Sequence, residues 1–237
     1  DIIVNAHKIN AGERVPLEKR SRDFLFIRRD NPAAIIKDMM VLLRDKLPGY
    51  VGAEIQEIQI MTPMRKGALG VEQLNRILQE NFNPPAADKP EKEAGGTIFR
   101  TGDKVMQIKN DYDIPYERDG AEAGVGAYNG DMGIITAVDP ESRAVTVQMD
   151  DRKYIYGADQ LAELEPAYAV TVHKSQGSEF PAVIMPVADV PARLCYRNLL
   201  YTGVTRARRL CILAGTRRTE QAMVQNVRQN MRYSGLR

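Results

Sequence analysis

The sequence has little cysteine, which limits the chemistry it can support. Its two cysteines, Cys195 and Cys211, lie among apolar residues without a CxxC spacing or a nearby pair of histidines. We therefore expect two buried thiols, and neither a disulfide nor a metal site. Long apolar runs are also missing, since no stretch approaches the ~18 residues of a membrane span. The first residues lack the basic and then apolar order of a signal peptide. These absences predict a cytoplasmic protein without a membrane partner.

The chain also lacks a large excess of positive or negative charge. Lys and Arg total 33 against 31 Asp and Glu, a formal net charge of +2, so any affinity for a polyanion must come from a local cluster. The chain has no GxxxxGK loop followed by Ser or Thr (Walker A) and no strand that ends in an Asp-Glu pair (Walker B). Those two elements hold a nucleoside triphosphate and its Mg²⁺. We therefore expect this chain, taken alone, to be inactive as an ATPase.

What is present is an alternation of strand and helix patterns at both ends of the chain. The segment 23–27 (DFLFI) predicts a buried strand, and 32–47 has apolar residues at helical spacing up to Pro48-Gly49. After residue 166 the predicted elements are a strand at 182–187, a helix at 197–206, a strand at 210–214 and a helix at 219–231 capped by Thr219. Strands that alternate with helices predict an α/β fold with a doubly wound, mostly parallel sheet.

The middle of the chain has a different character. Residues 81–96 are polar and rich in proline, which is linker composition. Between 97 and 165, short β patterns separated by turn signals predict a small β-barrel, and 110–127 is expected to be a mobile loop. The predicted domains are a discontinuous α/β domain, 1–95 with 166–237, and a β-barrel insertion, 96–165.

Two segments concentrate groups that bind phosphate and sugar. In 167–180 (AYAVTVHKSQGSEF), Thr171, His173 and Lys174 come close together, and Gly177 lets backbone approach a ligand. Glu179 suits a ribose hydroxyl better than a phosphate, because two anions repel. His173 taken singly would more often be a structural histidine, but inside this run a ligand-binding role is favoured.

The second segment, 197–209 (RNLLYTGVTRARR), places Arg206 on a predicted helix among small neighbours. A guanidinium can donate several hydrogen bonds to a γ-phosphate whose charge is shared among three oxygens. This is the arginine-finger role, and loss of such a residue costs on the order of 10³ to 10⁵ in rate.

Together with these two segments, four others in the same order resemble one family. They are NAHKIN (5–10), TPMRKG (62–67), GDKVMQIKNDYD (102–113) and YNGDMG (128–133). The set resembles the C-terminal region of the RecD-like superfamily-one DNA helicases, of the exodeoxyribonuclease V alpha subunit type. The resemblance implies a second RecA-like motor domain that contains an SH3-like β-barrel insertion, which agrees with the interrupted layout.

The resemblance also implies roles for single residues. TPMRKG resembles the family's motif IV and HKSQG its motif V, both of which line the single-strand track. Gly177 and Glu179 would face the nucleotide, and Arg206 resembles the catalytic arginine of motif VI. Whether Arg65 faces DNA or nucleotide stays open, and 62–67 alone would also suit a basic loop before a helix. The candidate contacts to the DNA backbone are Thr62, Arg65, Lys66, Thr171, His173 and Lys174.

The implied function is that of a motor-domain fragment of an ATP-dependent DNA helicase that moves 5′ to 3′ on single-stranded DNA. ATP and Mg²⁺ would be bound mainly by an N-terminal RecA-like domain of the same protein, and we expect no cofactor in this chain alone. A recombination or repair complex is a further candidate partner. Two alternatives stay open: a non-catalytic module that binds single-stranded nucleic acid, and the motor half of an RNA helicase or relaxase-helicase.

The tyrosines of the insertion allow two roles. They could stack on DNA bases, at about 1 to 3 kcal/mol per base, or pack the core of a small β domain. Packing is the favoured interpretation. The five residues are Tyr112, Tyr116, Tyr128, Tyr154 and Tyr156.

Overall fold

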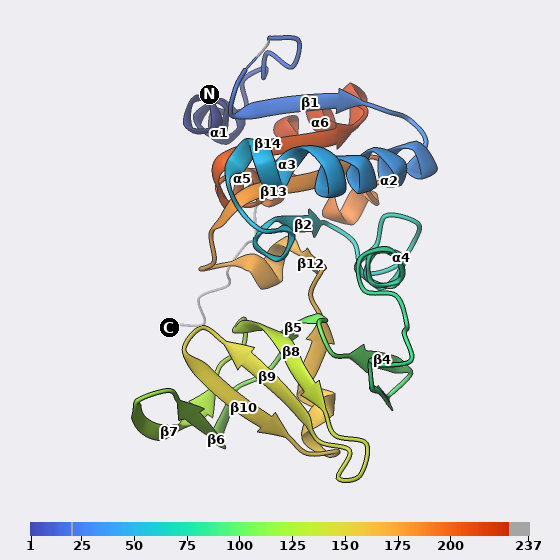
Figure 1. Cartoon of the computed structure of the whole chain (residues 1–237). Helices are drawn as coiled ribbons and strands as arrows, with labels where there is room; N and C mark the ends of the chain where they lie inside the picture. The colour runs from blue at the N-terminus through green and yellow to red at the C-terminus, as the bar shows by residue number, and fades with distance from the viewer. Residues whose placement is uncertain (20, 228–237) are drawn as a thin grey trace, which may run out of the picture. The chain divides into compact units, whose positions relative to one another are not determined.

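The computed structural model describes residues 1–19 and 21–227, and Figure 1 shows their helices and strands. The chain forms two compact units, a first unit of Asp1–Gly70 with Thr171–Arg237 and a second unit of Val71–Val170. The predicted domain boundaries lie near residues 95 and 165. They differ from this division because α4 (Val71–Phe82) and the hairpin that follows it group with the second unit.

The first unit is built on β1, β14, β13 and β2, which follow one another in that order in a five-stranded sheet that β12 completes. β14 pairs in parallel with β1 and with β13, and β13 pairs in parallel with β2. Nearly all residues of β13 and most of β14 are buried, as expected for parallel strands covered on both faces. The prediction of a doubly wound α/β fold is confirmed. The strands are β1 (Phe24–Arg28), β2 (Gln59–Thr62), β12 (Ala169–Thr171), β13 (Phe180–Val187) and β14 (Ala207–Gly215).

Helices lie on both sides of this sheet. In Figure 1, α2 (Pro32–Val41) and α3 (Leu47–Val51) are in front of the sheet, and α6 (Arg217–Gln225) is behind it. α5 (Arg197–Val204) packs against both α6 and α1 (Ile2–Ala11). The connection from β13 through α5 to β14 is therefore a crossover between neighbouring parallel strands.

Two helices differ from the predicted ones. The helix expected to stop at Pro48-Gly49 passes through a π-helical turn, Leu42–Lys46, and continues as α3. Proline is tolerated there because it lies near the start of that short helix, where no N–H is required. The cap of α6 is Thr216 and not Thr219, since the Thr216 side chain accepts a hydrogen bond from the Thr219 N–H at 3.1 Å. The predicted end of this helix, at residue 231, lies outside the described residues.

The second unit contains a seven-stranded antiparallel sheet in the order β11-β5-β8-β9-β10-β6-β7, and a separate hairpin of β3 and β4. Its strands are β3 (Glu91–Ala94), β4 (Thr97–Arg100), β5 (Lys104–Gln107), β6 (Asp111–Arg118), β7 (Ala121–Ala127), β8 (Met132–Val138), β9 (Val145–Met149), β10 (Arg152–Tyr156) and β11 (Leu164–Pro166).

Tyrosines fill the core of the second unit. Tyr154 and Tyr156 are both 0% exposed. Their hydroxyls donate to the Gly126 carbonyl and to Gln107 Oε1, each at 2.9 Å, so neither buried hydroxyl is left without a partner. The packing role is confirmed for these two residues. By contrast, Tyr112 and Tyr128 are exposed and meet edge to face at 6.2 Å between ring centroids.

Two predictions about the second unit are wrong. Residues 110–127, expected to be a mobile loop, contain the whole of the hairpin β6-β7. Residues 81–96, expected to be a linker, include the end of α4 and the strand β3, which pairs with β4 across Gly95-Gly96. Both glycines have positive φ, 57° and 78°, as a two-residue type I′ turn requires.

Both cysteines are free thiols. Cys211 is buried, and its burial raises the pKa of the thiol to about 12, whereas Cys195 is only half-buried. The expectation of burial therefore holds fully for Cys211 alone. Within the part of the chain that the structure describes, no helix combines the length and apolar character that crossing a membrane requires.

Candidate functional site

The first group of predicted site residues lies on a tight turn between β12 and β13. A 3-10 helix, Val172–Ser175, follows β12, and the Thr171 side chain caps it by accepting a hydrogen bond from the Lys174 N–H at 3.4 Å. Ser175 is buried and its Oγ donates to the Val172 carbonyl at 2.8 Å. These two bonds fix the turn. His173 is therefore held at the surface, with Lys174 half-buried beside it.

His173 has a partner that the sequence pattern does not indicate. Its Nε2 lies 3.0 Å from the hydroxyl of Tyr196, and the tautomer decides which atom donates. Tyr196 immediately precedes α5, and it ends the segment Pro191–Tyr196. The bond therefore orients the imidazole and joins the turn to that segment.

Arg206 lies in the turn between α5 and β14, and not on a helix as predicted. Its Nη1 donates to the Ser178 carbonyl at 3.2 Å and its Nη2 to Thr205 Oγ1 at 3.3 Å. The carbonyl of Arg206 accepts a hydrogen bond from the Phe180 N–H at 2.9 Å. These bonds hold the guanidinium against Gly177–Glu179, so the two segments predicted to face a nucleotide lie side by side.

One donor of Arg206 stands apart from the others in its hydrogen bonding. Its Nε is buried and lacks a hydrogen-bond partner among the residues that the structure covers. Buried polar groups without partners are rare, because each forfeits the free energy of its lost hydration. An anion that reached this guanidinium would satisfy the donor.

Gly177 and Glu179 differ in how the fold uses them. Gly177 has φ of 87°, and a Cβ there would meet nothing within 4 Å, so glycine is required by backbone conformation and not by crowding. The Glu179 carboxylate accepts a hydrogen bond from Arg208 Nε at 2.6 Å, and both side chains are exposed. Exposed pairs of this kind contribute about 0 to 1 kcal/mol, so Glu179 can exchange this partner for a ligand at little cost.

The second group of predicted residues lies on the loop after β2. Thr62 is fully buried, and its hydroxyl donates to the Leu69 carbonyl at 2.7 Å and accepts from the Met64 N–H at 3.2 Å. Thr62 therefore closes the base of the loop and does not present its hydroxyl at the surface. Gly70 ends the loop where its backbone packs closely against that of Lys66. A Cβ at this position would lie 2.5 Å from the carbonyl carbon of Lys66.

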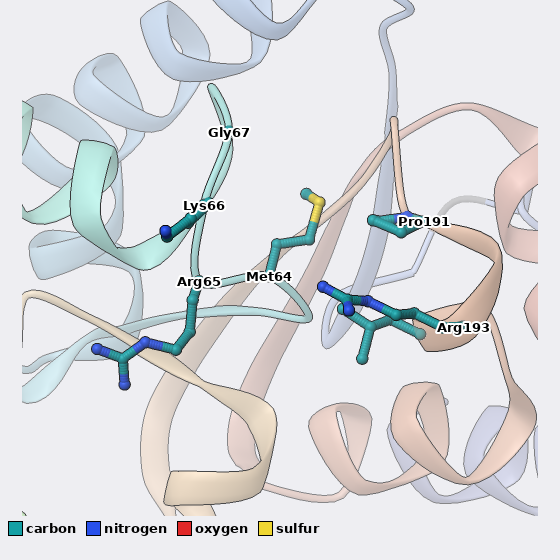
Figure 2. Close-up of a pocket in the computed structure, with 7 residues that line it drawn as sticks. Met64, Arg65, Lys66, Gly67, Pro191 and Arg193 are labelled. Carbon is teal, nitrogen blue, oxygen red and sulfur yellow. The ribbon is translucent and has the colours of Figure 1, made fainter.

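A surface pocket of about 530 Å³ opens beside this loop. In Figure 2, the side chain of Arg193 extends toward Met64. The side chains of Arg65 and Lys66, on the opposite wall, point away from Arg193. Three of the residues that line the pocket are cationic, and none of its described lining residues carries a carboxylate, so this composition suits an anion. The wall from 191 to 194 was not predicted, because its sequence, PARL, has neither periodicity nor a motif. The lining includes Met64, Arg65, Lys66, Pro191, Arg193 and Leu194.

Comparisons with known proteins agree with this layout. A family model described as the SH3 domain of ATP-dependent RecD-like DNA helicases matches residues 74–149. A second, described as the C-terminal domain of UvrD-like helicases, matches 166–214, the range that holds the β12–β13 turn and Arg206.

Two curated relatives extend the match. The chain is 36% identical over 159 residues to the ATP-dependent RecD2 DNA helicase of Deinococcus radiodurans, an alignment that covers 67% of this chain and 20% of that protein. It is 29% identical over 220 residues to the RecBCD enzyme subunit RecD of Mycobacterium tuberculosis, covering 90% of this chain and 35% of the relative. The chain thus spans between a fifth and about a third of the length of these relatives.

The fold has a solved counterpart as well. The crystal structure of Pif1 helicase from Candida albicans superimposes with a TM-score of 0.51 at 13% identity, over 94% of this chain and 54% of that one. At this identity the likeness concerns the fold alone. The family models and the curated relatives together identify a C-terminal fragment of a superfamily-one helicase. Within that class, the chain belongs to the RecD-like helicases, and its residues 74–149 correspond to their SH3 domain.

Proposed function

We propose that this chain is the second motor domain of an ATP-dependent helicase that moves 5′ to 3′ along single-stranded DNA. The observation that carries the proposal is the contact between Arg206 and Ser178, which joins the two segments predicted to meet a nucleotide. The Deinococcus relative is named as an ATP-dependent DNA helicase, which supports DNA as the substrate and ATP as the energy source of the longer protein. In this proposal residues 1–95 with 166–237 act as the motor and 96–165 as the insertion.

On the nucleotide side, Arg206 would hold the terminal phosphate of ATP. Its buried, unpartnered Nε fits that role, and Gly177 and Glu179 lie on the adjoining loop, where Glu179 would bind a ribose hydroxyl. ATP supplies the phosphoryl group whose charge the guanidinium stabilises. The described residues contain no group of three or more His, Cys, Asp or Glu side chains that could hold a metal. We assign Mg²⁺ and most contacts to ATP to an N-terminal RecA-like domain, and expect this chain alone to be inactive.

On the DNA side, cationic and polar groups would hold phosphates without reading bases. Arg65, Lys66, His173 and Lys174 supply these groups, and a motor that passes over any sequence needs contacts of this kind. We assign Arg65 to the DNA because it lines the same pocket as Lys66. Thr62 and Thr171 would act by fixing the two loops that carry these residues, since their hydroxyls already bond to them.

The names of the relatives suggest a partner complex for the longer protein. Those named as subunits of the RecBCD enzyme make a recombination or repair complex the proposed assembly for the longer protein. A cytoplasmic location stays a prediction.

The test uses the full-length protein and measures ATP hydrolysis with and without single-stranded DNA. Arg206→Ala should lower the stimulated rate by on the order of 10³-fold or more while DNA affinity stays within about twofold. Arg28→Ala, an exposed arginine at the end of β1, is the matched control and should leave both quantities unchanged. Unchanged turnover in Arg206→Ala would remove Arg206 from the mechanism. If the parent protein binds strands without hydrolysing ATP, the alternative of a non-catalytic binding module is correct.

A further inference from the structure

We infer that the segment Pro191–Tyr196 forms a second wall of the single-strand site, and that Arg193 on this segment holds a DNA phosphate. The inference rests on the proposed function and adds to it a residue that no motif marks. Its basis is a juxtaposition: one short segment contacts both groups of residues predicted to bind the strand.

The first contact is the pocket beside the loop after β2. Arg193 and Leu194 form one side of it, and Arg65 and Lys66 belong to the other. The second contact is the bond of 3.0 Å between Tyr196 and His173. The segment therefore spans the distance from the loop that carries Lys66 to the turn that carries His173, and a strand held by both would pass along it.

The segment is held in place by its own backbone. Residues Ala192–Leu194 form a 3-10 turn in which the Leu194 N–H donates to the Pro191 carbonyl at 2.8 Å. The side chain of Asn226 donates to the Cys195 carbonyl at 2.6 Å and fixes the far end. Arg193 is exposed on this fixed turn, and its guanidinium extends toward Met64 in Figure 2. A cation on such a support can bind an anion with little loss of backbone entropy.

The chemistry of the pocket favours a nucleotide of the strand. Arg193 would bind phosphate, while Met64, Pro191 and Leu194 offer apolar surface to a sugar or the face of a base. The segment bonds to the β12–β13 turn at His173, whereas Arg206 bonds to the loop beyond it at Ser178. This difference places Arg193 with the strand and Arg206 with ATP.

The experiment measures binding of a fluorescent oligo-dT to the full-length protein at several salt concentrations. Arg193→Ala and Arg193→Gln should each weaken binding about tenfold and lower the slope of log affinity against log salt by about 0.7, the value for one lost contact with a single strand. Arg193→Lys should keep most of the slope, because it keeps the charge. The control Arg28→Ala should match the parent protein, and the KM for ATP should not change in any variant.

Two results would overturn the inference. One is parent-like affinity and slope in Arg193→Gln, a variant that keeps the Cβ–Cγ–Cδ stem and a polar end without the charge, and decides the matter even where Arg193→Ala does not fold. The other is a raised KM for ATP with unchanged DNA binding, which would move Arg193 to the nucleotide. The ATP turnover of the parent protein separates this inference from the proposed function. If the parent protein shows no DNA-stimulated ATP turnover, the motor proposal fails. If turnover is intact and the Arg193 variants bind DNA like the parent protein, only this inference is refuted.

Discussion

Glu220 is a buried carboxyl whose ionisation should oppose folding. Its side chain is 1% exposed, and Oε1 has no hydrogen-bond partner within the described chain. Burial raises the pKa of Glu220 to about 7 from the ordinary 4.5, although Arg217 and Arg14 act in the opposite direction. The folded state therefore binds the proton more tightly than the unfolded state. Stability is greatest below the unfolded pKa and falls as the pH rises from about 4.5 to about 7.

The size of this effect follows from the two pKa values. The difference between about 7 and 4.5, at about 1.36 kcal/mol per pH unit, gives an upper value of about 3.4 kcal/mol. Glu220 lines a small pocket with Arg14, and solvent that entered this pocket on ionisation would screen part of the penalty, so we expect about 1 to 3 kcal/mol. Glu220→Gln, which cannot ionise, should raise the free energy of unfolding by this amount at pH 8. At pH 4.5 the gain should be less than about 0.5 kcal/mol.

Urea unfolding at a series of pH values between 4.5 and 8 measures the difference directly. Glu13→Gln is the matched control, because Glu13 is exposed and lies in the same unit. Its unfolding free energy should change by less than about 0.5 kcal/mol at every pH. An equal gain for Glu220→Gln at pH 4.5 and pH 8 would refute the reasoning, since a packing effect does not depend on protonation. Destabilisation at pH 8 would refute it too.

Two further substitutions test the supports of the site and of the second unit. Asn75, 6% exposed, donates to the Pro166 and Ala169 carbonyls at 2.9 Å and accepts from the Ala169 N–H at 2.7 Å. Asn75→Ala should therefore cost about 2 to 4 kcal/mol in urea unfolding, and a loss under about 0.5 would contradict this account. Gly70→Ala would put a methyl group 2.5 Å from a backbone carbonyl carbon of its own loop, so DNA affinity should fall at least about fivefold while ATP affinity is kept. Gly49→Ala, with nothing within 4 Å of its Cβ, is the control. Equal DNA affinities in the two variants would contradict a role of the loop after β2 in DNA binding.

The α/β part of the fold could be predicted because its signal is local. The apolar run at 182–187 falls within β13, and the run at 210–214 falls within β14, where both faces of the strand are buried. Such runs are long and uninterrupted, so their period leaves little ambiguity. The hairpin β6-β7 gives no such signal. Pro115 interrupts the alternation in β6, and the glycines of β7 make it resemble a loop until the partner strand is known.

The candidate site could be predicted only in part, for a related reason. Residues that share a motif, such as His173 and Lys174, stand together in the sequence, and their chemistry is visible there. Their partners come from elsewhere in the chain. Tyr196 is 23 residues from His173, and Ser178 is 28 residues from Arg206, so only the packing of α5 against the sheet brings them together. The role of Thr62 as a buried support likewise depends on burial that its motif does not encode.

The strand β7 lies at the edge of the seven-stranded sheet. An edge strand exposes unpaired N–H and C=O groups, and a second copy of the same strand is a natural partner for them. The hairpin β6-β7, which forms this edge, carries exposed carboxylates at Glu117, Asp119 and Glu122. The exposed apolar side chain of Val125 lies on the same hairpin. Two such edges could pair only by bringing like charges together. Like charges on the acidic hairpin therefore disfavour strand-to-strand pairing between two copies of the chain.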